Sequence, residues 1–76
     1  MTSKGQAVQN WEYVVVEWRG ATERIEELRM DGEAVDDWEN QSLPELLKQF
    51  GDNGWELASV YPGGSFVRMI FKRAKG

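Results

Sequence analysis

The side chains that could perform acid–base or metal chemistry in this sequence are almost all carboxylates. The chain has no histidine and no cysteine, so it lacks the usual general base, the commonest metal ligand and any thiolate. Carboxylates occur in adjacent pairs, Glu26–Glu27 and Asp36–Asp37, but neighbours in a strand or loop point apart and stay solvated. A raised carboxylate pKa needs burial in a cleft. We therefore predict no catalytic residues and a protein that is not an enzyme.

An acidic stretch from Asp31 to Glu39 raises the question of a calcium site. An EF-hand loop needs acids at alternating positions, glycine at the sixth and glutamate at the twelfth. Here Gly32 follows the first acid directly, so the spacing does not match. The turn at 62–65 leads into a strand and not into a helix N-terminus, so it lacks the geometry of a phosphate site. The sequence predicts no metal site and no cofactor.

Length and charge limit the class of protein. Seventy-six residues, of which 41% are hydrophobic and 29% charged, make one small globular domain. Residues 1–62 hold all thirteen acids and five basic residues, whereas residues 63–76 hold four basic residues and no acid. The apolar run Trp11 to Trp18 is too short to span a bilayer, so we expect the protein not to have a membrane as a partner. The absence of cysteine is compatible with a reducing cytoplasm, where we expect the protein to work.

The clearest strand runs from Asn10 to Arg19 and is expected to end at Gly20, after a disordered leader at residues 1–9. It is rich in β-branched and aromatic residues and contains no breaker. Both faces are apolar, which is typical of a central strand covered on both sides. One face consists of Trp11, Tyr13 and Val15, and the other of Val14, Val16 and Trp18.

A hairpin and a helix should follow. Asp31-Gly32 favours a type I′ turn, so we predict paired strands at Arg24 to Met30 and Glu33 to Asp37. Ser42 is suited to be a helix N-cap, with Glu45 three residues later completing a capping box. We expect Gly51 and Gly54 to stop the helix, with Gly51 as its C′ residue. Its apolar stripe comprises Leu43, Leu46, Leu47 and Phe50.

Two strands complete the domain, at Trp55 to Tyr61 and Ser65 to Arg73, joined by a turn at 62–64. The fold class is therefore α+β: a mostly antiparallel sheet of four to five strands with one helix on one face, in the order β-β-β-α-β-β. The domain spans residues 10–73, and residues 74–76 should fray.

One helix can cover only one face of such a sheet. The second face should need a lid, and a second copy of the chain or another protein is the favoured partner, with a homodimer as the simplest case. An alternative in which the four tryptophans only complete a thin core stays open. The candidate partner-binding residues are Trp11, Tyr13, Trp18, Trp38 and Phe66.

Single-stranded nucleic acid is the alternative partner. The segment 64–71 has a faint likeness to the aromatic strand of an RNA-recognition domain, and basic residues flank it. The net charge of −4 opposes binding to a phosphate backbone except at this end. A small-molecule-binding domain or enzyme is the third possibility. The candidate nucleic-acid residues are Arg68, Lys72, Arg73 and Lys75.

Several segments resemble a family of small bacterial domains of unknown function. Trp11 to Val16 is similar to the family's opening W-E-Y-x-V-V strand. Leu43 to Leu47 and Gly54 to Val60 resemble its helix and its G-W-E-L-V-S-V strand, and Phe71 to Arg73 resembles its terminal F-K-R. The resemblance implies a small α+β domain and brings no activity or site residue. The segment from residue 19 to residue 41 is longer than in the family pattern.

Overall fold

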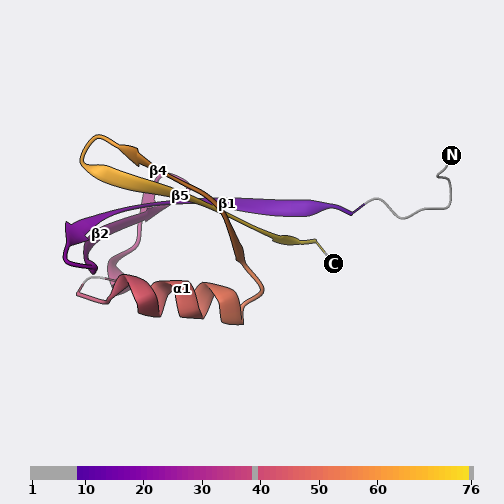
Figure 1. The fold of residues 1–76 in the computed structure, drawn as a ribbon, viewed down its shortest axis with the longest axis horizontal. Helices are drawn as coiled ribbons and strands as arrows, with labels where there is room; N and C mark the ends of the chain where they lie inside the picture. Colours follow the sequence, from indigo (N-terminus) through magenta and orange to yellow (C-terminus); the bar gives the residue numbers. More distant parts are fainter. Residues whose placement is uncertain (1–8, 39, 76) are drawn as a thin grey trace, which may run out of the picture.

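The computed structural model describes residues 9–38 and 40–75. They form one antiparallel sheet of five strands with one α-helix beneath it (Figure 1). The predicted α+β class and the order of elements are confirmed. The predicted leader lies outside the described residues except for its last residue. The elements are β1 (Trp11–Ala21), β2 (Arg24–Met30), β3 (Glu33–Ala34), η1 (Asp36–Trp38), α1 (Leu43–Asp52), β4 (Glu56–Gly63) and β5 (Phe66–Ala74).

The long strand β1 lies at the centre of the sheet, whose order is β3-β2-β1-β5-β4. It does not end at Gly20 as predicted but continues to Ala21, with a bulge between Arg19 and Gly20. A Cβ atom on Gly20 would collide with the carbonyl oxygen of Arg24. Gly20 is therefore needed for the close approach of β1 and β2, not to stop the strand.

The turn between β2 and β3 has the predicted residues in the predicted conformation. Asp31 and Gly32 both have positive φ, 50° and 89°, as a type I′ turn requires. Strand β3 is shorter than predicted, because the chain leaves the sheet after Ala34 and forms a 3-10 turn at Asp36–Trp38. The edge that β3 provides is consequently only two residues long.

Helix α1 begins as predicted. The hydroxyl of Ser42 accepts a hydrogen bond from the N–H of Glu45 at 3.3 Å, and the N–H of Leu43 donates to the carbonyl of Glu23 at 2.6 Å. The second bond ties the helix start to the β1–β2 turn. Gly51 is not the C′ residue as predicted, because the helix continues to Asp52; the positive φ falls on Gly54, the second glycine that was predicted to stop the helix.

The last two strands form a hairpin that is slightly shifted from the prediction. Strand β4 extends to Gly63, and the turn has its positive φ at Gly64. Strand β5 includes Ala74, and the N–H of Lys75 donates to the carbonyl of Asn10 at 2.9 Å. The two ends of the described chain are therefore joined by the pairing of β1 and β5.

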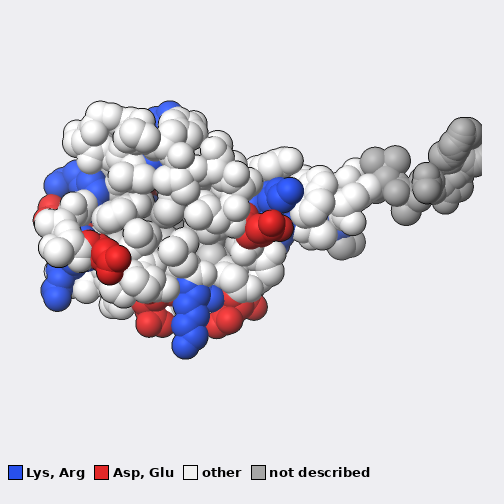
Figure 2. All heavy atoms as spheres, viewed as in Figure 1, with Lys and Arg blue, Asp and Glu red and all other residues white. Residues whose placement is uncertain are grey.

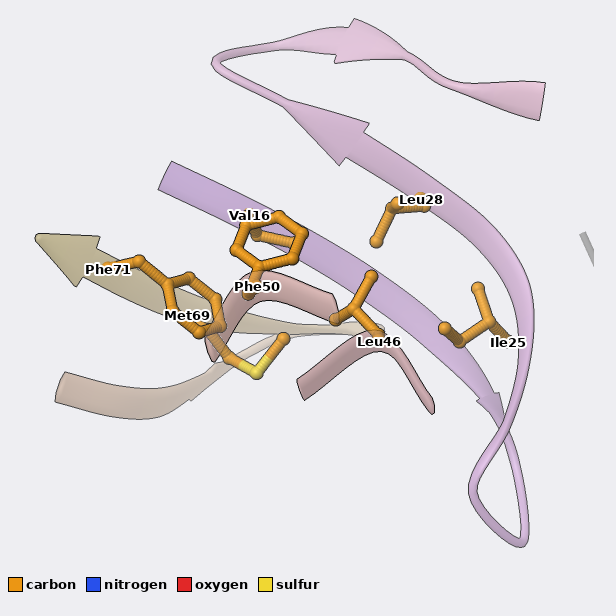
Figure 3. Close-up of a cluster of buried hydrophobic side chains, with 7 residues drawn as sticks. All are labelled: Val16, Ile25, Leu28, Leu46, Phe50, Met69 and Phe71. Carbon is orange, nitrogen blue, oxygen red and sulfur yellow. The ribbon is translucent and has the colours of Figure 1, made fainter. Parts of the chain in front are cut away.

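The core lies between α1 and the sheet (Figure 3). The Phe50 ring is central: its centroid lies 4.5 Å from that of Phe71 and 6.5 Å from that of Trp55. The second contact packs Trp55 against the helix. The buried side chains are Val16, Ile25, Leu28, Leu46, Phe50, Met69 and Phe71.

Candidate functional site: the open face and outer edge of the sheet

The face of the sheet opposite α1, called the open face below, is built by alternate residues of the strands. Val16 and its partner Met69 are buried under the helix, so their neighbours along each strand point to the other side. The pairs on that side include Val15 with Ile70 and Tyr13 with Lys72. The open face comprises Trp11, Tyr13, Val15, Glu17 and Arg19 of β1, Phe66, Arg68, Ile70 and Lys72 of β5, Glu27 and Arg29 of β2, and Glu56, Ser59 and Tyr61 of β4.

An ion pair lies at the centre of the open face. Oε2 of Glu17 accepts from Nη2 of Arg68 at 2.6 Å and from Nε at 3.0 Å. The same guanidinium lies 5.7 Å from the centroid of the Tyr61 ring. The carboxylate raises the pKa of Arg68 above its usual range, chiefly through this hydrogen bond. Arg68 is therefore held in place by both neighbouring strands.

Two more basic side chains cover aromatic rings on the open face. Arg29 lies 4.6 Å from the Phe66 ring centroid, and Nζ of Lys72 lies 4.4 Å from that of Trp11. Long basic side chains cover apolar surface with their stems while their charged ends stay in water. Part of the lid that the sequence predicted for this face is therefore supplied by the chain itself.

The β2 end of the open face carries a small network of charges. Arg19 contacts Glu26 and Glu27, both at 3.1 Å, and Arg29 contacts Glu27 at 3.2 Å. The hydrogen bond from Arg19 is the main reason that the pKa of Glu27 is lowered, with Arg29 adding to it and partial desolvation opposing it. The acidic side chains of β2 are thus balanced locally by two arginines.

Arg73, predicted as a nucleic-acid residue, lies on the α1 side of the sheet. Its Nε atom is 2.8 Å from Oε2 of Glu12, its guanidinium is 4.3 Å from the centroid of the Trp55 ring, and Nη1 donates to the carbonyl of Asn53 at 3.1 Å. These contacts close one end of the core at the C-terminus of α1, where a cation is favourable. Arg68 and Arg73 thus lie on opposite faces, while Lys75 is exposed just beyond β5.

The aromatic residues predicted to bind a partner are divided between the two faces. Trp11, Tyr13 and Phe66 are on the open face, where Tyr13 is 60% exposed and Trp11 40%. Trp18 and Trp38 instead pack against the core cluster on the α1 side. As predicted, Trp11 and Trp18 lie on opposite faces of β1.

The open face contains a wide hollow of about 440 Å³ lined by Val15, Glu17, Asp31, Tyr61 and Arg68, with the adjacent Gly32. Its two central charged groups are paired with each other, so the hollow offers a small ligand few unpaired polar atoms. Within the described residues, no group of three or more acidic side chains is arranged to hold a metal ion. The charged groups at the centre of the hollow therefore already have partners within the chain.

The outer edge of the sheet is formed by β4, which is exposed at all eight positions. Leu57 and Val60 pair with the buried residues Phe71 and Met69, so they point to the α1 side. They are nevertheless 40% and 53% exposed. Figure 2 shows mainly uncharged surface over β4 and the β4–β5 turn, with charged atoms toward its margins.

The sequence analysis did not select β4 as a binding surface. The sequence does contain one indication of such a surface, because no charged residue occurs from Leu57 to Val67. An uncharged strand is, however, equally typical of a buried position. Only the strand order shows that this segment forms an edge.

Comparisons with known protein families, with curated proteins and with solved structures found no match. The resemblance to small bacterial domains therefore stays a prediction. In the part of the chain that the structure describes, no helix is long and apolar enough to cross a membrane.

Proposed function

We propose that the chain is a non-enzymatic interaction module that associates with a second copy of itself through the uncovered part of its sheet. The observation that carries this proposal is the exposure of β4 at every position, although Leu57 and Val60 share the face of the core. An exposed apolar strand at a sheet edge is costly for an isolated molecule and is commonly covered or used for binding. We place this module in the cytoplasm, which cell fractionation would check.

The charges on the open face support an interaction role over catalysis. The carboxylate of Glu17 is engaged by two hydrogen bonds from Arg68, and Glu27 is held by Arg19 and Arg29. A general base needs an available lone pair directed at a substrate. These carboxylates instead stabilise the arrangement of the strands.

The nucleic-acid alternative is less well supported by the geometry. Arg68 and Arg73 are paired with carboxylates and lie on opposite faces. The aromatic faces of Trp11 and Phe66 are covered by basic side chains, so bases could stack there only after displacing them. Binding of mixed-sequence single-stranded oligonucleotides that weakens steeply with salt would favour this alternative.

Absolute mass by light scattering after size exclusion tests the proposed function. We expect a mass approaching twice 8.7 kDa as the protein concentration rises. A mass of one chain at every concentration up to the millimolar range would contradict self-association. The measurement needs no ligand and does not depend on which surface is used.

A further inference from the structure

The two edges of the sheet differ in length and charge. Strand β3 has only two residues, Glu33–Ala34, and acids precede and follow it at Asp31 and Asp36. Short, charged edges resist pairing with another chain. Strand β4 has eight residues, and Glu56 at its start is its only charged residue. The β4 edge therefore lacks the protection that the β3 edge has.

Two exposed apolar side chains lie along the α1 side of β4. Leu57 and Val60 pair with the buried residues Phe71 and Met69 and are 40% and 53% exposed; together they are called the edge strip below. The helix carries one further exposed apolar side chain, Leu47, which is 36% exposed. It lies roughly 160° around the helix from Gln49, which lines a hollow with Asp37 and Trp38, so Leu47 points away from η1.

The charge pattern around β4 suits a second copy of the same segment. Two acidic molecules repel each other at most surfaces, but the segment from Leu57 to Val67 carries no charge. Two such segments can therefore meet without opposing like charges. A partner that recognised this edge by charge would find no counter-charge from Leu57 onward.

We propose that the β4 strands of two copies pair antiparallel, so that the two five-stranded sheets become one continuous sheet. Such a pair has a two-fold axis perpendicular to the sheet, and both α1 helices then lie on the same face. The edge strip of one copy meets the edge strip of the other across the seam. This inference rests on the proposed function and specifies its surface.

Two features limit the length of the seam. Glu56, which precedes the uncharged segment, carries a charge, and Pro62, near its other end, has no N–H to donate. The pairing is therefore confined to the segment from Leu57 to Tyr61. Main-chain hydrogen bonds there provide alignment, and the edge strip provides apolar contact.

Disulfide formation by single introduced cysteines tests this arrangement, because the native chain contains no cysteine. Residues opposite each other in an antiparallel pair have Cα atoms about 4.5–5.5 Å apart, within the range of a disulfide. Among Ala58→Cys, Ser59→Cys and Val60→Cys, we expect one or two adjacent positions to cross-link rapidly. Tyr13→Cys, exposed on the open face, should cross-link slowly.

A pair of matched charge variants tests the β4 seam separately from the proposed self-association. Val60→Glu should raise the dimer dissociation constant at least about tenfold, whereas Tyr13→Glu, at a similarly exposed site, should leave it unchanged. Circular dichroism is the control that checks whether each variant is folded. A dimer lost with Tyr13→Glu but kept with Val60→Glu would overturn the β4 seam and leave the proposed function standing. A native chain that is always monomeric would overturn both.

Discussion

The carboxylate of Asp31 accepts a hydrogen bond from the N–H of Val15 at 3.0 Å, while the N–H of Asp31 donates to the carbonyl of Val15 at 2.8 Å. Pairing of β2 with β1 reaches Val16 and Met30, so Asp31 satisfies the next backbone groups of β1 at the point where β2 turns away. One residue thus forms the turn and ends the ladder.

This double role gives a first prediction. Asp31→Ala should lower the free energy of unfolding by about 1–2 kcal/mol, because it removes a hydrogen bond and places alanine at a positive φ. Asp31→Asn keeps a side-chain acceptor and tolerates the same φ, so it should cost much less. Urea denaturation of the three proteins measures this order. Equal losses for both variants would show that the side-chain oxygen is unimportant.

A second prediction concerns the bulge at Gly20. Gly20→Ala should destabilise the fold by at least about 2 kcal/mol, because the added Cβ would collide with the carbonyl oxygen of Arg24. Gly51→Ala is the matched control. It lies within α1, where an added Cβ would meet no atom within 4 Å, and should raise stability by about 0.5–1 kcal/mol. Thermal unfolding followed by circular dichroism compares the two, and a harmless Gly20→Ala would contradict the close approach.

A third prediction separates a structural from a ligand-binding role for Arg73. Arg73→Gln should lower the free energy of unfolding by about 1–2 kcal/mol, since it removes the contacts with Glu12 and the Trp55 ring. Trp55 fluorescence should change, because the cation leaves its ring face. Chemical denaturation checks the first effect. Unchanged stability with weakened oligonucleotide binding would instead support the nucleic-acid alternative.

A fourth prediction follows from the lowered pKa of Glu27. A carboxyl group whose pKa is lower in the folded state stabilises the fold above its unfolded pKa, and this stabilisation is lost as the pH falls through the folded pKa. Glu27→Gln should therefore be less stable than the native chain at neutral pH, and the difference should shrink as the pH falls below about 4.5. Denaturation midpoints at pH 7 and pH 3 measure it. A difference that does not depend on pH would point to packing and not to charge.

Local signals predicted much of the fold. The Asp31-Gly32 turn and the start of α1 at Ser42 depend on residues close in sequence, and both have the predicted conformation. The ends of β1 and α1 were placed wrongly, because Gly20 and Gly51 were interpreted as breakers. In the fold, Gly20 is required by its close contact with Arg24 on the next strand, which no local pattern records.

The candidate site was harder to predict because it depends on strand order. The sequence indicated a surplus of aromatic residues for one helix to cover, but not that Arg29, Arg68 and Lys72 would cover part of that surplus. Nor could it show that β4 forms an edge. Register and strand order arise from pairings distant in sequence, so the exposed apolar surface became evident only with the fold.

Amide hydrogen exchange in β4 tests the β4 seam most directly. Alternate amides of an edge strand point away from its neighbour, and in the described part of the chain no strand lies beyond β4 to accept from them. If two β4 strands pair, those between Leu57 and Tyr61 should exchange slowly at concentrations where the mass doubles and rapidly after dilution. Rapid exchange of these amides in a solution that light scattering shows to be dimeric would contradict the seam.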